Sequence, residues 1–194
     1  MDTLNFSIAI LSLLLGIYNS YVMRKRITVN WGELRLINAD TLYFGSTTHP
    51  YRSVSKFYML DIDIINNSAS NISYFYLRAF NPKININYNI ANYNALPDYL
   101  QNTKPYIIID NYTLFPNIPD KLYGSLNGNS FTRLTLLIYD SPICPIVEDD
   151  MVISFAIPDT SLMNVFANPF NKAQHFKRYK KSFSIKSAKN TIVT

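Results

Sequence analysis

The chain opens with a long uncharged apolar run and continues with short segments in which apolar and polar residues alternate. No residue from Leu4 to Met23 is charged, and Arg24, Lys25 and Arg26 follow at once. About 20 apolar residues in a helix span roughly 30 Å, the thickness of the hydrocarbon core of a bilayer. The pattern therefore predicts one transmembrane helix. The side chains expected to hold it in lipid include Leu4, Ile8, Leu11, Leu15 and Val22.

A cleaved signal peptide and a buried core helix are the alternatives to this anchor. A signal peptide has a basic start and a small-x-small cleavage site, whereas residues 1–3 carry no cation and residues 19–26 offer no such site. A helix that is apolar all round and ends in three cations suits a bilayer better than a protein core.

The cations after the apolar run set the expected orientation. Arg24, Lys25 and Arg26 flank its C-terminal side, and no Lys or Arg flanks the other side. The positive-inside rule then places the N-terminus outside and the remainder of the chain in the cytoplasm. The single cysteine, Cys144, agrees with a reducing compartment, since it cannot form an internal disulfide. We therefore expect a single-pass protein of the cell membrane.

Residues 27–194 alternate with the period of strands. From Val54 to Asn66, Leu60 and Ile62 point one way while Asp61 and Asp63 point the other. A short helical turn is expected at 95–101, and loops or turns at 47–50, 66–71 and 124–129. Further strands are expected at 27–36, 41–45, 72–80, 84–90, 106–109, 131–139, 151–157 and 176–185.

Short strands, short loops and no long soluble helix predict an all-β fold, specifically an immunoglobulin-like β-sandwich preceded by the transmembrane helix. The chain has 194 residues and is 48% hydrophobic, which is enough for a proper core and excludes a disordered tail. We expect an anchor with its basic stop at 1–26 and a single β-sandwich domain at 27–194.

The organisation resembles a group of small, N-terminally anchored β-sandwich proteins found in low-GC Gram-positive bacteria and their phages. The likeness lies in the strand–turn–strand unit from Leu60 to Leu77, the strand from Leu134 to Tyr139 and the closing strand from Phe183 to Lys186. Residues 83–106 are not part of that pattern. The group has no agreed activity, so the resemblance implies a fold and a topology but no active site.

No catalytic signature stands out in the domain. Glycine-rich phosphate loops and nucleophile elbows are absent from the sequence. Asp61 and Asp63 share a face, but the solvent side of a half-buried strand accounts for them. Cys144 has no local protease signature, and the two histidines, His49 and His175, are distant from it in sequence. We therefore expect no enzyme activity, no cofactor and no metal site.

One acidic cluster keeps an enzymatic alternative open. Glu148, Asp149 and Asp150, with Asp140 across the turn, supply oxygen donors that a divalent cation could use. A membrane-tethered, metal-dependent hydrolase is therefore one alternative function, and binding of nucleic acid or anionic lipid through the basic C-terminal strand is the other.

Two surfaces are candidates for binding. Lys177, Arg178, Lys180 and Lys181 lie in a C-terminal stretch with no acidic residue, which suits an anionic membrane leaflet or, less well, nucleic acid. The outer face of a last strand is the simpler interpretation. The tyrosines from Tyr88 to Tyr112 form either a binding surface or a core under an insert.

The expected function is therefore contact rather than catalysis. The sequence predicts an adaptor, a regulator or a phage-related accessory factor whose cytoplasmic domain binds membrane lipid and a protein partner.

Overall fold

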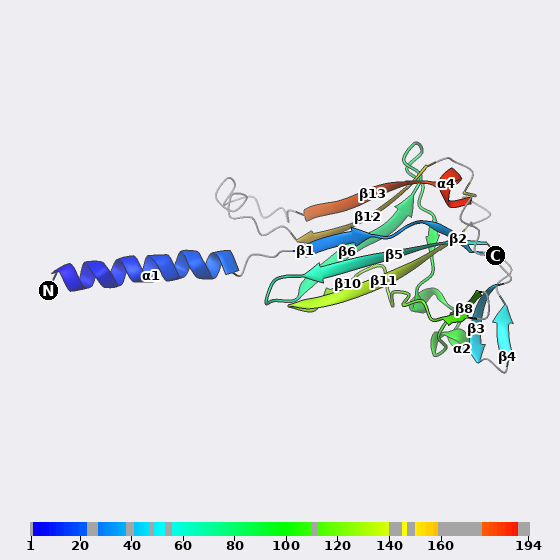
Figure 1. The fold of residues 1–194 in the computed structure, drawn as a ribbon, viewed down its shortest axis with the longest axis horizontal. Helices are drawn as coiled ribbons and strands as arrows, with labels where there is room; N and C mark the ends of the chain where they lie inside the picture. Colours follow the sequence, from blue (N-terminus) through cyan, green and yellow to red (C-terminus); the bar gives the residue numbers. More distant parts are fainter. Residues whose placement is uncertain are drawn as a thin grey trace.

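The computed structural model describes a helix followed by a domain built from β-sheets (Figure 1). The residues that it describes are 2–22, 27–37, 41–46, 49–52, 56–109, 112–139, 145–146, 150–158 and 176–189. Strands dominate this part of the chain, so the prediction of an all-β fold is confirmed.

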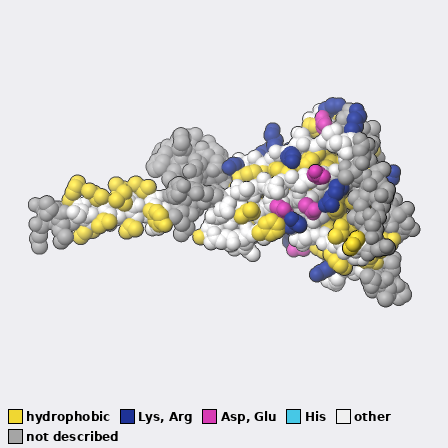
Figure 2. All heavy atoms as spheres, viewed as in Figure 1, with side chains coloured by type: hydrophobic (Ala, Val, Ile, Leu, Met, Phe, Trp, Pro, Cys, Tyr) yellow, Lys and Arg dark blue, Asp and Glu magenta, His cyan; other side chains and the backbone are white. Residues whose placement is uncertain are grey.

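Helix α1, Asp2–Val22, lies apart from the sheets at one end of the molecule (Figure 1). Every side chain from Asn5 to Asn19 is exposed, including those of Ile8, Leu11 and Leu15. Figure 2 shows apolar side chains along the visible face of this helix. In the described residues, no helix combines the length and the apolar character that crossing a membrane requires. The side chains of Leu4 and Val22 lie outside the description, as do residues 24–26.

The first sheet has five strands joined in antiparallel pairs. Its path runs β1-β5-β11-β7, and β2 pairs with β5 beside β1. The long central pair, β5 and β11, is in register from Phe57↔Tyr139 to Asn66↔Ser130. The strands are β1 (Ile27–Trp31), β2 (Arg35–Ile37), β5 (Phe57–Asn66), β7 (Asn89–Ile90) and β11 (Ser130–Tyr139).

The second sheet has four strands in the order β10-β6-β12-β13, again antiparallel. Strand β13 lies at one edge of this sheet and carries the basic stretch that the sequence singled out. The strands are β6 (Ile72–Phe80), β10 (Gly124–Leu126), β12 (Asp150–Pro158) and β13 (Phe176–Ser184).

The two sheets share one hydrophobic core. Leu60 and Ile62 of the first sheet and Ile153 and Phe155 of the second are all at most 1% exposed and belong to one cluster. The Trp31 ring bridges the sheets, because its centroid lies 6.0 Å from that of Phe155. The alternating apolar residues that predicted the strands are therefore the residues that join the layers.

A third, smaller sheet covers part of the outer face of the first. Its order is β4-β3-β8-β9. Phe57 and Met59 point away from the main core and pack with Leu42 and Ile107 of this sheet in a second cluster. The remaining elements are β3 (Leu42–Ser46), β4 (His49–Arg52), β8 (Tyr106–Ile109), β9 (Tyr112–Leu114), the 3-10 helix η2 (Tyr93–Ala95), α2 (Asp98–Gln101) and α4 (Ile185–Lys189).

Several local expectations were wrong. Residues 49–50, expected in a loop, begin strand β4, and residues 124–126, expected in a turn, form strand β10. The strand expected at 84–90 is reduced to the two residues of β7 and a bridge from Asn87 to Phe80. The last strand ends at Ser184, and Ile185 begins helix α4.

Candidate functional site

The four predicted binding cations all lie on β13, but they do not form one surface. Side chains alternate along a strand, so Lys177 and Lys181 share a side with Tyr179 and the buried Phe183. Each of these lysines rests over an aromatic ring, with Nζ 5.1 Å from the ring centroid of Tyr179 or Phe183 respectively. These two ammonium groups lie at the rim of the core.

Arg178 and Lys180 lie on the opposite side of β13, which is the outer face of the second sheet. Arg178 is paired with Ala156 of β12 and Lys180 with Ser154. The structure therefore divides the predicted cluster into two pairs that face different surroundings. Of these cations, only Arg178 and Lys180 lie on the outer face of the second sheet.

A β-bulge in β6 shapes this outer face. Ser154 pairs with Arg78 and Ala156 pairs with Phe75, so β6 contributes one more residue to this stretch than β12 does. The extra residue is Tyr76, whose φ of 54° lies in the left-handed region. The bulge resets the alternation, because Leu77 returns to the core while Phe75 and Tyr76 lie consecutively on the outer side.

Beside the bulge lies a depression of about 330 Å³. Its cationic groups come from both neighbours of β12: Arg78 from β6 and Arg178 from β13. The Arg78 guanidinium lies 4.2 Å from the ring centroid of Phe80, and its Nε donates to the Ser154 hydroxyl at 3.5 Å. The depression is lined by Tyr76, Arg78, Ser154, Phe155, Ala156, Phe176 and Arg178.

The charged side chains that are known to line this depression are all positive. None of the described residues that line it is acidic, and among the four strands of this sheet the one carboxylate is Asp150, where β12 begins. No ion pair in the described part of the chain neutralises Arg78 or Arg178. Two guanidinium groups, a hydroxyl and exposed aromatic rings can hold an anion that has an apolar neighbour.

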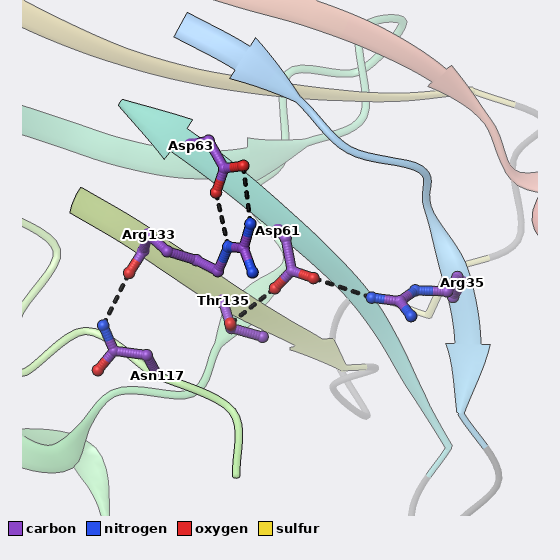
Figure 3. A network of polar contacts seen from close by, with 6 residues as sticks. All are labelled: Arg35, Asp61, Asp63, Asn117, Arg133 and Thr135. Atoms are coloured by element: carbon purple, nitrogen blue, oxygen red, sulfur yellow. Dashed lines mark hydrogen bonds and ion pairs between the residues drawn. The ribbon is translucent and has the colours of Figure 1, made fainter. Parts of the chain in front are cut away.

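Asp61 and Asp63, by contrast, are neutralised on the outer face of the first sheet (Figure 3). The Arg133 guanidinium donates to both oxygens of Asp63, from Nε at 2.7 Å and from Nη2 at 2.9 Å. Asp61 accepts from Arg35 at 2.9 Å and from the Thr135 hydroxyl at 2.7 Å. Figure 2 shows neighbouring acidic and basic side chains over the middle of the domain.

The pKa of Asp63 lies below its ordinary value because Arg133 donates hydrogen bonds to the ionised carboxylate. A catalytic acid or base at neutral pH needs a pKa shifted the other way. The sequence-based interpretation of this pair as the polar face of a strand fits the geometry, with the addition that each aspartate has an arginine partner.

The remaining candidates are scattered or lie outside the described residues. Residues 140, 144, 148–149 and 175 are among those not described, and Asp150 is the one member of the acidic cluster that is. In the described ranges no three His, Cys, Asp or Glu side chains come together as metal ligands would. The tyrosines divide, since Tyr88 and Tyr106 are buried while Tyr99 and Tyr112 are exposed.

Sequence reasoning missed Tyr76, Arg78 and Ser154 as site residues. One signal was present, because Tyr74, Phe75 and Tyr76 are three consecutive aromatic residues in a predicted strand. Strict alternation that buries Tyr74 and Tyr76 would place Leu77 on the outer face, so the strand needs an irregularity to bury that leucine. Comparison of the chain with protein-family models, curated proteins and solved structures found no match.

Proposed function

We propose that this protein is a single-pass membrane protein whose domain acts by binding rather than by catalysis. The observation that carries the proposal is the exposure of α1. Nine of its large side chains are at least 43% exposed: Phe6, Ile8, Ile10, Leu11, Leu13, Leu14, Leu15, Ile17 and Tyr18. Leaving such a side chain in water costs about 1.5–3 kcal/mol relative to burying it. Burial in lipid removes this cost. The uncharged sequence from Leu4 to Met23 extends beyond the side chains that the structure describes, 5–19, and reaches the length of a membrane span.

The proposed location of the domain is the cytoplasmic side of the membrane. Arg24, Lys25 and Arg26 follow the apolar run, and the three residues before it include no cation. Cations close to the end of a span stay on the cytoplasmic side. The proposed orientation places the N-terminus outside.

The proposed architecture of the domain is an immunoglobulin-like sandwich. Two antiparallel sheets that share one core support it. The third sheet is an addition to that pattern, and it covers Phe57 and Met59, which a plain sandwich would leave on the surface. The proposed kinship with the anchored β-sandwich proteins of low-GC Gram-positive bacteria rests on the sequence alone.

A binding role is supported by which charged side chains have ion-pair partners and which do not. The two strand carboxylates, Asp61 and Asp63, are each held by an arginine, which makes them structural. The basic outer face of the second sheet carries arginines with no ion-pair partner in the described residues, and such groups are suited to contact with an anionic partner.

The anchor is tested by extracting the full chain from cell membranes with alkaline carbonate. We expect the unaltered chain to remain with the membranes. The double variant Leu11→Arg with Leu14→Arg should be released, because each arginine at a helix centre costs about 2.5–3.5 kcal/mol of insertion free energy. Phe131→Arg is the control, since Phe131 lies on the domain and is 58% exposed, like Leu11 at 59%. Release of the unaltered chain would refute the anchor.

The orientation is tested by adding protease to intact cells. We expect the domain to survive and to be digested only after the membrane is permeabilised. Digestion from outside overturns the cytoplasmic placement while leaving the anchor itself in place.

A further inference from the structure

We propose that the depression beside the β6 bulge is a binding site for a phosphate group. We define this phosphate site by Tyr76, Arg78, Ser154, Phe176 and Arg178. The two arginines are placed on opposite sides of the depression. Strands lie about 4.8 Å apart, so Arg78 and Arg178, on either side of β12 and two residues out of step, have Cα atoms roughly 12 Å apart. Two side chains of that length can converge on one anion from opposite sides.

The polar groups of the site match the chemistry of a phosphate group. Guanidinium groups present forked donors that match phosphate oxygens, and Ser154 between them adds a hydroxyl. Ser154 is 9% exposed, so its hydroxyl lies at the floor of the depression and not on an open surface. Elsewhere in the described domain the arginines Arg35 and Arg133 are held by carboxylates. The two at this site have no such carboxylate partner among the described residues, so their charge is available to a ligand.

The backbone of Tyr76, at the bulge, is strained. A tyrosine in the left-handed region costs on the order of 1–3 kcal/mol, and such conformations gather at functional sites. The strain here holds a side chain that is 69% exposed next to Arg78, across from Phe176, which is 38% exposed. Exposed rings beside paired cations favour a phosphate that carries an apolar or planar group.

The position of the site in the chain points to a source of phosphate groups. Phe176 begins β13 opposite Pro158, at the end of the sheets that faces α1 (Figure 1). The four residues between Val22 and Ile27 bridge at most about 18 Å. If α1 is in lipid, as the proposed function has it, the phosphate site lies within reach of lipid headgroups. A soluble phosphate ester is the other source of the same chemistry.

The site is tested with the full chain in nonionic detergent, titrated with glycerol 3-phosphate and followed by the NMR shifts of Tyr76, Ser154 and Arg178. We expect saturable shifts, and we expect the dissociation constant obtained from them to rise about tenfold or more in Arg178→Gln, because a hydrogen bond to a charged group is lost. Lys181→Gln is the matched control, since it removes the same charge from the same strand on the opposite side. Absence of saturation, or equal weakening in both variants, overturns the site.

The two sources are separated with the full chain in vesicles of phosphatidylcholine alone or mixed with phosphatidylglycerol. Protection of the β13 amides from hydrogen exchange that appears only with phosphatidylglycerol, and is lost in Arg178→Gln, identifies a headgroup. Binding of glycerol 3-phosphate without such protection identifies a soluble ester. Because the detergent titration does not require insertion, a failed anchor and a failed phosphate site give different results.

Discussion

At the scale of single residues, Asn66 is the polar side chain on which two loops depend. It is 1% exposed, and its Nδ2 donates to the backbone oxygens of Ser70, Leu126 and Asn127 at 2.9, 3.0 and 2.9 Å. Its Oδ1 accepts from the amide and the hydroxyl of Ser68. One amide therefore joins the turn after β5 to the turn before β11.

Replacing Asn66 is expected to destabilise the domain severely. Asn66→Ala leaves buried carbonyls without donors, at about 1–3 kcal/mol for each group that water cannot reach. Asn66→Asp keeps the shape but replaces the donor with a charged acceptor, so we expect it to be at least as damaging. Urea unfolding measures both. Asn67→Ala is the control, because Asn67 is exposed, and equal stability of all three variants would contradict this role.

The hydrogen-bonded pair of Asp63 and Arg133 predicts a dependence of stability on pH. The pKa of Asp63 is lowered from 3.8 in the folded chain, so below that value the unfolded chain binds more protons. The stability that the pair contributes is therefore complete above about pH 5, and it is lost as the pH falls through the folded pKa.

Arg133→Gln is expected to return the pKa of Asp63 towards 3.8 and to flatten the acid limb of the stability curve. The NMR titration of the Asp63 carboxyl carbon reports the first effect, and urea unfolding between about pH 3 and pH 6 reports the second. Lys104→Gln, which removes an exposed cation elsewhere, provides the comparison. An unchanged pKa in Arg133→Gln would show that the hydrogen bonds do not cause the shift.

At the scale of elements, strand β13 is the edge of its sheet in the described part of the chain, and its lysines have a structural role. Unpaired backbone groups on an edge strand invite pairing with another chain, and natural sheets prevent this with charges that point inward. Lys177 and Lys181 are such charges, because they share a side with Tyr179 and Phe183. This role accounts for two of the three cations of β13 that the phosphate site does not use, and Lys180 on the outer face is the third.

Replacing both lysines is therefore expected to promote self-association rather than unfolding. Lys177→Thr with Lys181→Thr keeps strand propensity and removes the inward charges. Light scattering should show larger species that grow with concentration, while the thermal midpoint changes little. Lys104→Thr with Lys121→Thr removes two exposed cations away from β13 and should leave the chain as it was. Equal association in the two double variants would exclude edge protection.

The elements that the sequence located correctly are those that bury one face. Strand β6 was predicted with the bounds that it has, and β5, β11 and β12 to within three residues, because their apolar alternation is what joins the two sheets. The strands that were missed, β4, β9 and β10, have four residues or fewer and follow no clear alternation. Short pairings of this kind depend on tertiary partners that no local pattern reports.

The phosphate site could not be predicted from the sequence, for a related reason. The sequence identified the basic stretch, but whether Arg178 lies close to Arg78 depends on the pairing of β13 with β12 and of β12 with β6. The bulge then decides which aromatic residues lie outside. Register and bulges are set by contacts between distant segments, so the residue types were visible in the sequence and their grouping was not.

At the scale of the whole molecule, the outer face of the first sheet is used in three different ways along β5. Phe57 and Met59 are covered by the third sheet, Asp61 and Asp63 form the neutralised polar patch, and Ile65 is 41% exposed towards the α1 end. The two cores thus lie on opposite sides of one strand, and the stability of the domain depends on packing within residues 27–189.

The side chains of helix α1 that the structure describes take no part in that packing, which leads to a prediction about the whole chain. They run from Asn5 to Asn19, all are exposed, and neither core contains any of them. A chain that begins at residue 23 should therefore have the same thermal midpoint as the full chain in the same detergent, within about 2 °C. Circular dichroism or calorimetry measures both. A fall of more than about 5 °C, equivalent to 1–2 kcal/mol in a domain of this size, would show that α1 packs on the sheets. An unchanged midpoint leaves the exposed apolar surface of the helix available for lipid.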